Sequence, residues 1–450
     1  MDYGSFLLNH CSKSSLDKLN KLQSRCLRII IGGMKSSPIN ALQVECVDPP
    51  PSIRRQLLCD RFFFKLFQNS MHALLPKIRL LSESYDSRIP LEKLPCLLRS
   101  YLKISRLPSP VYTSPRYPLF CINYESLIFH PNIICGLGLR KNDPQTPKEF
   151  LKICVEKWRD WTLIYTDASK RSEHGPIGSA VWIPKFNVIL SLKSPSLSSI
   201  FTGEALAILE ALLYIHSHKL NRTVIFSDSL SVLLALRSNP FRSKSKFPLI
   251  FKIRQVLLQC IHEGLDVILV WIPSHTGILG NESADLFAKN AITDSAINHP
   301  SVYSHDLCSF ANRDMLAAWD SSWQISKQTK GVYYGFIQPT IPPKPWFFKY
   351  RHFPRSVTST ICRLRIGHAC TPVHLAKIRV RDHSLCECGL DEGSTNHILF
   401  SCSKLRYSLY DVLPSNNISL PTNSQLILSQ VDSAFIQTLS KFILSNNIKL

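Results

Sequence analysis

The chain has 450 residues, of which 45% are hydrophobic and 19% are charged, a composition typical of a folded globular protein and not of a disordered one. Its formal net charge of +21 indicates a polyanionic partner, either nucleic acid or an anionic membrane surface, although a basic protein without such a partner would have the same charge. The length allows two to four domains.

The sequence predicts an intracellular protein, in the nucleus or the cytoplasm, that is neither secreted nor bound to a membrane. The first residues do not carry a positive region followed by an apolar stretch, as a signal peptide would. The apolar run at 206–215 is short for a membrane span and is interrupted by Glu210. The 15 cysteines are scattered, so we expect most to be free thiols in a reducing compartment. Nothing in the sequence indicates an oligomer.

Helical periodicity dominates the N-terminal segment, residues 1–80. Apolar residues at helical spacing predict a helix that starts near Ser15 and ends at Gly32-Gly33, and a second helix over 52–68 follows three prolines. Residues 81–157 are rich in proline, which predicts an irregular connector with short strands or helices.

Residues 158–293 change to an alternation of strands and helices. The order is three strands, a helix, a strand, two helices, a strand and a helix, which predicts an α/β domain with a mixed five-stranded sheet and helices on both faces. The expected elements are 162–166, 178–183, 187–193, 203–218, 223–226, 229–237, 249–263, 267–271 and 281–292. Beyond them we expect a linker with helical stretches at 294–345, a small basic module at 346–410, and a tail at 411–450 with a helix over 422–445.

Four acidic residues stand where phosphoryl-transfer chemistry would need them. Asp167 and Asp228 each follow an apolar strand, Glu204 opens an apolar helix, and Asp285 lies in the last helix. If the two strands are adjacent and parallel, both carboxylates lie at one edge of the sheet. Converging carboxylates repel one another unless cations lie between them, and such oxygen ligands suit Mg²⁺ or Mn²⁺. A pair of these ions stabilises the attacking and leaving oxygens of a phosphoryl displacement.

Each acid also has a purely structural interpretation. An Asp after a strand is commonly a turn or helix cap, Glu204 could complement the helix dipole, and Asp285 could be solvated. The combination in this order is far more specific than any single residue.

The stretches YTDAS around Asp167, TGEA around Glu204, FSDS around Asp228, and WIPSHTG followed by GNESAD, with His275 and Asp285, resemble the motifs of type 1 ribonuclease H. The resemblance implies that the four acids hold two Mg²⁺ ions and that His275 assists turnover by proton transfer or product release. A loop histidine that only bonds its neighbours is the alternative for His275.

The resemblance implies an endonuclease that hydrolyses the RNA strand of RNA–DNA hybrids, reading backbone shape and the 2′-OH. The alternatives are a catalytically inactive nucleic-acid-binding remnant, and an exonuclease or integrase-like relative with the same sheet. The complete set of acids argues against the first, and the SHTG loop against the second.

Residues 239–254 carry five basic residues and no acid: Arg242, Lys244, Lys246, Lys252 and Arg254. In the family this stretch forms a basic handle that grips the hybrid, which implies nucleic-acid contacts for Arg242, Lys244 and Lys246. A solvated basic face explains the same pattern equally well.

The flanks resemble the polyprotein of a jockey-like non-LTR retrotransposon. LNKLQSRCLRI at 19–29 is similar to the region after a reverse transcriptase palm. The chain has no paired-Asp polymerase motif, and polymerisation needs such carboxylates. It therefore resembles a C-terminal fragment of a larger element that lacks the reverse transcriptase active site.

The C-terminal module carries a candidate zinc site. Cys386, Cys388, His397 and Cys402 form a Cys₂HisCys set that suits one tetrahedral Zn²⁺, with Cys362 and Cys370 outside it. Coincidence in a cysteine-rich chain is the alternative. The same retroelement families carry a similar knuckle after ribonuclease H, preceded by an Arg-x-Gly-His stretch such as 365–368.

Residues 321–381 contain eleven Lys or Arg, no Asp or Glu, and an aromatic cluster over 346–353. Basic groups with aromatics can bind single-stranded nucleic acid by phosphate contacts and base stacking. For most of these aromatic residues we favour the other interpretation, that they form the core of the module.

Overall fold

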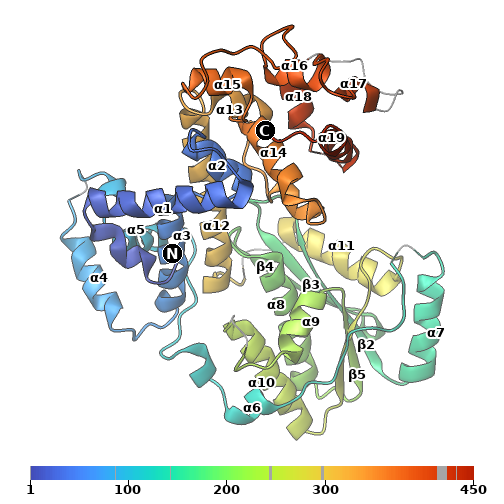
Figure 1. The fold of residues 1–450 in the computed structure, drawn as a ribbon. Helices are drawn as coiled ribbons and strands as arrows, with labels where there is room; N and C mark the ends of the chain where they lie inside the picture. Colours follow the sequence, from blue (N-terminus) through green and yellow to red (C-terminus); the bar gives the residue numbers. More distant parts are fainter. Residues whose placement is uncertain are drawn as a thin grey trace. The chain divides into compact units, whose positions relative to one another are not determined.

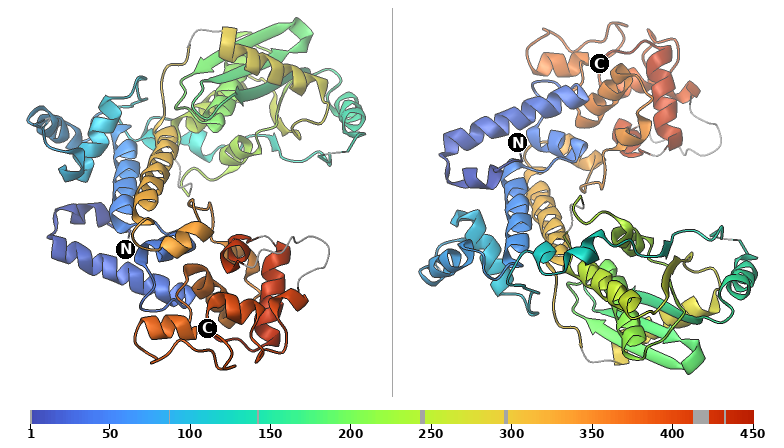
Figure 2. Two further views of the ribbon diagram at one scale, coloured as in Figure 1. Left: turned by 90° about the horizontal axis from the view of Figure 1, so that it is seen from above. Right: turned by 90° about the horizontal axis from the view of Figure 1, so that it is seen from below.

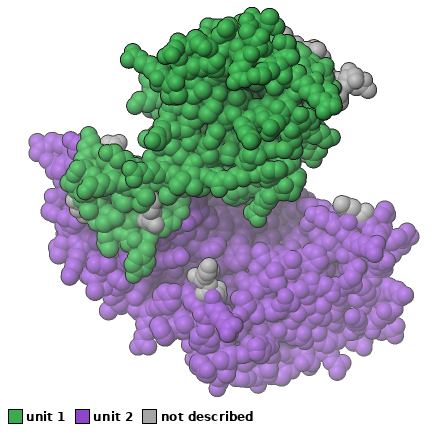
Figure 3. Space-filling model, viewed as in Figure 1, with its two compact units in different colours: residues 1–58, 313–450 green, residues 59–312 purple. Residues whose placement is uncertain are grey.

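The computed structural model describes residues 2–86, 88–141, 143–242, 246–294, 298–412, 423–431 and 433–450. The chain forms two compact units (Figure 3), one of residues 1–58 with 313–450 and the other of residues 59–312. The second unit contains the predicted α/β segment. The first joins two stretches that lie far apart in the sequence.

The second unit is built on a six-stranded sheet in the order β1-β6-β5-β2-β3-β4 (Figure 1). β2, β3 and β4 pair antiparallel, and β2, β5, β6 and β1 pair parallel. The bounds are β1 (Ile133–Ile134), β2 (Thr162–Lys170), β3 (Ile177–Ile183), β4 (Val188–Ser194), β5 (Thr223–Ser227) and β6 (Val267–Trp271). The predicted mixed α/β fold is confirmed. The expected five strands are joined by β1, which comes from the proline-rich connector and is too short to leave a sequence pattern.

Helices cover both faces of this sheet, as two views at right angles to Figure 1 also show (Figure 2). One face packs on α8 (Ile200–Ser217), α9 (Leu230–Arg237) and α10 (Pro248–His262), and the other on α7 (Thr146–Trp158) and α11 (Leu279–Asp294). Strand residues alternate between the two cores: Ile164 and Ile225 belong to the first, and Tyr165 and Phe226 to the second. This period of two is the normal consequence of strand geometry.

α8 is long and apolar enough to cross a membrane, by length and composition alone. The expectation that the apolar run is too short was therefore wrong as a matter of length. In the structure 61% of this stretch is buried, and α8 packs on β2 and β3. Its apolar character is explained by its place in the core.

The connector at 81–157 has more regular structure than its prolines indicate. It contains α5 (Cys96–Ser105), α6 (Tyr124–Ile128), α7 and β1. Pro147 lies in the first turn of α7, where a missing N–H costs nothing. The second unit also contains α4 (Leu74–Glu83) and parts of α3 (Pro51–Phe67) and α12 (Ser304–Ser326). α12 runs through much of the expected linker.

The first unit is helical. Besides parts of α3 and α12 it contains α1 (Lys13–Ile31), α2 (Ile39–Cys46), α13 (Val332–Ile337), α14 (Arg355–Ile366), α15 (Pro372–Lys377), α16 (Thr395–Phe400), α17 (Leu409–Val412), α18 (Ser424–Ser429) and α19 (Ser433–Ser445). The predicted N-terminal helices are present, although Ser12, not Ser15, caps α1.

The expected helix over 422–445 is two helices, α18 and α19, because the chain becomes extended at Gln430 (φ −84°, ψ 93°). Residue 422 lies outside the described residues.

A buried carboxylate joins the two stretches of the first unit. Glu45 in α2 accepts hydrogen bonds from Arg365 Nε at 3.0 and 3.2 Å, from Tyr334 Oη at 2.6 Å and from Trp346 Nε1 at 2.7 Å. Trp346 and Tyr350 are buried in the same core. The aromatic cluster is therefore mostly core, as we favoured, although Phe348 is half exposed.

Candidate active site and metal centres

Asp167 and Asp228 lie side by side because β2 and β5 pair in parallel. The last residues of that pairing are Thr166 and Ser227, so the next residue on each strand is one of the two acids. The prediction that the first strand stops before Asp167 was wrong, because β2 continues to Lys170 and Asp167 pairs with Ala180 of β3. The backbone of Asp167 is thus paired with β3 on one side. On the other side it lies one residue beyond the end of the β2–β5 pairing.

Glu204 reaches the two aspartates because α8 approaches the sheet closely. A Cβ on Gly203 would lie 2.6 Å from Ile177 Cγ2 and 2.9 Å from Ala168 Cβ, distances that real Cβ atoms do not adopt. Ser199 caps the helix by accepting the Thr202 N–H, which stabilises its start. Carboxylate oxygens of Asp167, Glu204 and Asp228 then lie within 4.8 Å of one another.

The electrostatics of the group formed by Asp167, Glu204 and Asp228 favour the binding of a cation. Burial, with the nearby charge of Asp228, raises the pKa of Asp167 to about 8. Burial and the charge of Asp167 raise the pKa of Glu204 well above its ordinary value. The Ala168 N–H donates to Asp167 Oδ1 at 2.7 Å and to Glu204 Oε1 at 3.3 Å. Glu204 Oε2 is buried and has no hydrogen-bond partner in the part of the chain that the structure describes.

An unpartnered carboxylate oxygen beside the buried Asp167 and the partly buried Asp228 is an unfavourable arrangement unless a positive charge joins it. All the donors are hard oxygens, which suit Mg²⁺ and Mn²⁺. The residues present therefore fit the divalent metals that we expected from the sequence.

Asp285 and His275 lie in a neighbouring group. Ligand atoms of His275, Glu282 and Asp285 are within 4.8 Å of one another, and Asp285 Oδ2 accepts from Lys289 Nζ at 2.6 Å. The charge of Asp285 is among the causes that raise the pKa of Asp167, after burial and Asp228. The structure thus places Asp285 close to the other three acids but does not include it in their tight group.

His275 occupies an exposed loop with a left-handed backbone (φ 55°). Burial raises the pKa of Asp228, and the charge of His275 opposes this rise. The imidazole therefore lies within electrostatic range of the acidic group while remaining open to solvent.

Two further residues at this site were not assigned a role from the sequence. The Asn281 side chain is 3% exposed and lies close enough to Asp228 to oppose the rise that burial causes in the pKa of that carboxyl. Glu282 Oε1 accepts the Gly277 N–H at 3.3 Å. Both lie inside the GNESAD stretch, which was the available signal. An Asn and a Glu in the first turn of a helix are so often caps that local sequence does not distinguish these roles.

The predicted basic handle is only partly at the surface. Arg242 is exposed, whereas Lys246 Nζ donates to the carbonyls of Pro240 and Phe241. Lys244 lies outside the described residues. Arg254, which we counted with this stretch, is 2% exposed and donates to backbone carbonyls of Ser126, Leu127, Phe129 and Leu236. The Arg254 guanidinium therefore links the connector to α10 through these hydrogen bonds, and it does not add to the basic surface.

The four predicted zinc ligands come together in one group. Cys386 Sγ lies 3.6 Å from Cys402 Sγ, and Cys388 Sγ lies 3.2 Å from His397 Nε2. Zn–S bonds of about 2.3 Å and Zn–N bonds of about 2.0 Å in a tetrahedron would separate neighbouring ligand atoms by roughly 3.5–3.8 Å. All four ligand atoms are within 4.8 Å of one another, so the set fits zinc with small adjustments.

The local structure explains how this group forms. Gly389, in the left-handed conformation (φ 78°), returns its N–H to the Cys386 carbonyl at 3.0 Å, and this tight turn holds the two nearby thiols together. Ser394 caps α16, which carries His397. Cys402 follows the end of α16. Cys362 is fully buried in the core of the first unit, and neither Cys362 nor Cys370 belongs to the cluster, as predicted.

Comparison with known proteins finds similarity in the predicted α/β segment. The sequence model of the RNase H family matches residues 159–293. Human ribonuclease H1 is similar at 23% identity over 148 residues, which is 30% of this chain and 51% of that protein. The chain therefore spans about half the length of this curated relative. With the sheet order and the acidic group, these matches lead to one conclusion: residues 159–293 of this chain form a ribonuclease H domain.

Proposed function

We propose that this protein is an active endonuclease that hydrolyses the RNA strand of RNA–DNA hybrids. The observation that carries the proposal is the convergence of Asp167, Glu204 and Asp228 around an unpartnered, buried carboxylate oxygen in a domain whose family implies this substrate. A decayed site would not be expected to keep an arrangement that is unfavourable without metal.

Asp167, Glu204 and Asp228, with Asp285 beside them, would hold two Mg²⁺ or Mn²⁺ ions. Such ions, when bound, stabilise charge on the attacking and leaving oxygens of a phosphodiester. The chain's own groups prepare the site for them: the Ala168 N–H donates to Asp167 and Glu204, and the Asn281 side chain lies close to Asp228. His275, on its exposed loop beside Asp285, would assist turnover by proton transfer or product release.

The test is substrate choice. Labelled RNA–DNA hybrid, duplex DNA and duplex RNA of one sequence are incubated with the full chain in Mg²⁺. We expect cleavage of the RNA strand of the hybrid, with duplex DNA intact because it presents no 2′-OH groups. Equal cleavage of duplex DNA would instead indicate a general nuclease, and hybrid binding without cleavage would indicate an inactive nucleic-acid-binding remnant.

We also propose that Cys386, Cys388, His397 and Cys402 bind one Zn²⁺ that stabilises the C-terminal module. Leu385 and Leu390, which flank the two nearby cysteines, are exposed, so this turn buries little apolar surface and metal binding would supply much of its folding energy. The module would then bring its basic stretch to single-stranded nucleic acid and raise the local concentration of the nuclease on its substrate.

Metal analysis of the purified full chain under reducing conditions tests this second proposal. We expect one zinc per chain, lost in His397→Ala and kept in the matched control His383→Ala, because His383 is exposed and lies outside the cluster. Hybrid affinity should fall with the zinc while cleavage at saturating substrate is retained. A zinc-free chain that stays folded in chelator would show that the cluster is coincidental, and zinc loss with unchanged affinity would restrict the metal to a structural role.

We propose finally that the chain derives from a retrotransposon polyprotein and acts inside the cell, in the nucleus or the cytoplasm. The support is the resemblance of residues 19–29 to the region after a reverse transcriptase palm. Genomic copies should then lie downstream of reverse transcriptase sequence. A single copy in an unrelated gene would contradict this origin, and tagged protein in the culture medium would contradict the location.

A further inference from the structure

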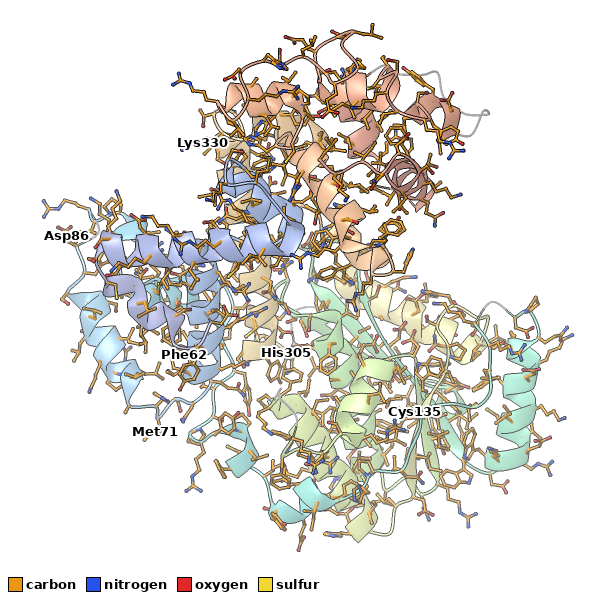
Figure 4. The ribbon with its side chains drawn as sticks, in the orientation of Figure 1. Phe62, Met71, Asp86, Cys135, His305 and Lys330 are labelled. Atoms are coloured by element: carbon orange, nitrogen blue, oxygen red, sulfur yellow. The ribbon has the colours of Figure 1, made fainter. Side chains whose placement is uncertain are left out.

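A basic cavity lies outside the acidic site but inside the second unit. It has a volume of about 390 Å³ and is lined from three directions: by Arg61, Lys65 and Gln68 near the end of α3, by the first turns of α12 including His305, and by Lys246 and Phe247 ahead of α10. His305 is labelled in Figure 4. None of the ribonuclease H motifs contributes to it.

The charged residues that line this cavity are all positive. Arg61, Lys65 and Lys246 line it, and no Asp or Glu does so among the described residues. Burial raises the pKa of the Cys308 thiol across the cavity, and the charges of Lys65 and Arg61 oppose that rise. Arg61 Nη2 also donates to Asn312 Oδ1 at 2.5 Å, which holds the guanidinium in place. A cavity of this kind favours an anion.

Two polar groups in the wall have no partner within the described structure. Gln68 is 5% exposed; its Oε1 accepts from Ser304 Oγ at 2.5 Å, but its Nε2 makes no hydrogen bond. His305 Nδ1 is likewise buried and without a partner. A buried donor left unpaired is unfavourable, so a ligand that accepts hydrogen bonds would be stabilised here.

The remaining wall is aromatic. Phe247 and His305 lie with ring centroids 5.3 Å apart, at an interplanar angle of 37°, and Tyr117 also lines the cavity. Aromatic side chains beside cations bind nucleotides by stacking on the base while the cations contact the phosphate. The volume falls within the range of small-ligand sites, roughly 300–1,000 Å³, and is too large for a lone ion.

We propose that this cavity binds one nucleotide of a nucleic-acid strand, with its phosphate on Arg61 and Lys65 and its base against His305 and Tyr117. The strand, not a free nucleotide, is favoured because the proposed function gives this protein a nucleic-acid substrate and the chain carries a formal net charge of +21. The inference rests on that function for the identity of the ligand. It places a substrate contact on α3 and α12, outside residues 159–293.

Binding is measured in EDTA, so that cleavage does not interfere, by fluorescence anisotropy of a labelled hybrid with a single-stranded extension at several salt concentrations. Arg61→Gln and Lys65→Gln should each weaken binding and lower the slope of log affinity against log salt by about 0.7–0.9, the value for one lost phosphate contact. Lys65 is exposed and has no hydrogen bond among those described, so its variant should fold even if Arg61→Gln does not.

Lys152→Gln is the matched control, since the Lys152 side chain is 76% exposed on α7 and pairs with Glu156 of the same helix; it should leave the slope unchanged. Cleavage of the hybrid at saturating substrate should persist in all three variants, which separates failure of this inference from failure of the nuclease function. Unchanged slopes in both cavity variants would overturn the inference. If adenosine monophosphate displaces the hybrid from the wild type but not from Lys65→Gln, the cavity binds a free nucleotide, and the assignment of a nucleic-acid strand as its ligand is wrong.

Discussion

At the residue scale, the carboxylates that would bind metal make the metal-free protein less stable as pH rises. The folded state holds the pKa of Asp167 at about 8, above its ordinary value of 3.8. Between these values the folded chain binds a proton that the unfolded chain has released, so the free energy of unfolding falls as pH increases. The cause is burial first and the charge of Asp228 second.

Asp167→Asn should therefore stabilise the metal-free protein at high pH. In EDTA, urea unfolding of the wild type should show a loss of stability between about pH 5 and about pH 8 that is smaller in the variant, by on the order of a few kcal/mol, since one pKa unit corresponds to about 1.4 kcal/mol. Asp160→Asn, a change at an exposed position, serves as the control. A variant with the same pH dependence as the wild type would mean that Asp167 does not titrate in this way.

Which side chains meet at the site was only partly predictable. Asp167 and Asp228 could be placed together because each follows an apolar stretch, and parallel strands present such residues at one edge. Arg254 and Lys246 looked like the rest of a basic run, yet both donate to backbone carbonyls. For Arg254 the partners are carbonyls of Ser126 and Leu127, far away in the sequence, and a local run of basic residues does not reveal such contacts.

At the element scale, Gly203 sets the distance between α8 and the sheet. In Gly203→Ala the new methyl group would collide with Ile177 and Ala168, so α8 must move and carry Glu204 with it. Overpacking of this kind costs about 1–3 kcal/mol. We expect a lower melting temperature, measured by circular dichroism, and a hybrid cleavage rate reduced at least about tenfold, because small displacements at a catalytic centre are costly.

Gly136→Ala is the matched control, because a Cβ there meets nothing within 4 Å, and it should leave both quantities unchanged. Full activity and stability in Gly203→Ala would show that α8 can move away without displacing Glu204.

Long periodic elements were predictable, and short or polar ones were not. α8 and α10 follow from apolar residues at helical spacing. The end of β2 was missed because Asp167–Lys170 is not an apolar run, and it is the pairing with β3 that makes it a strand. β1 consists of two residues paired with β6, and its position depends on β6 being present. In both cases tertiary pairing overrides local preference.

At the scale of the whole molecule, the first unit depends on contacts between residues that the sequence separates widely. Glu45 and Arg365 are each 1% exposed and form an ion pair, with Tyr334 and Trp346 as further donors to the same carboxylate. Local patterns in the sequence predicted separate segments at 1–80 and 346–410, because periodicity does not show which distant helices pack together.

Glu45→Gln should destabilise the first unit strongly. It leaves the guanidinium of Arg365 buried without a counter-charge, and loss of one partner of a buried pair costs about 3–5 kcal/mol. Urea unfolding followed by tryptophan fluorescence measures this, since Trp346 lies beside the pair. The control is Glu83→Gln, which removes an exposed ion pair with Arg79. It should lower the free energy of unfolding by less than about 1 kcal/mol. Equal effects of the two substitutions would contradict the role assigned to Glu45.

The most direct test of the whole account is cleavage of a labelled RNA–DNA hybrid by the wild type and by Asp167→Asn, each in Mg²⁺ and in EDTA. Asn keeps the shape of the side chain and removes the charge that would hold the ions. The account predicts RNA-strand cleavage by the wild type in Mg²⁺ only, and a loss of at least about a thousandfold in the variant, or about 4 kcal/mol in the barrier, with hybrid binding retained. Cleavage by Asp167→Asn at the wild-type rate, or cleavage in EDTA, would contradict it.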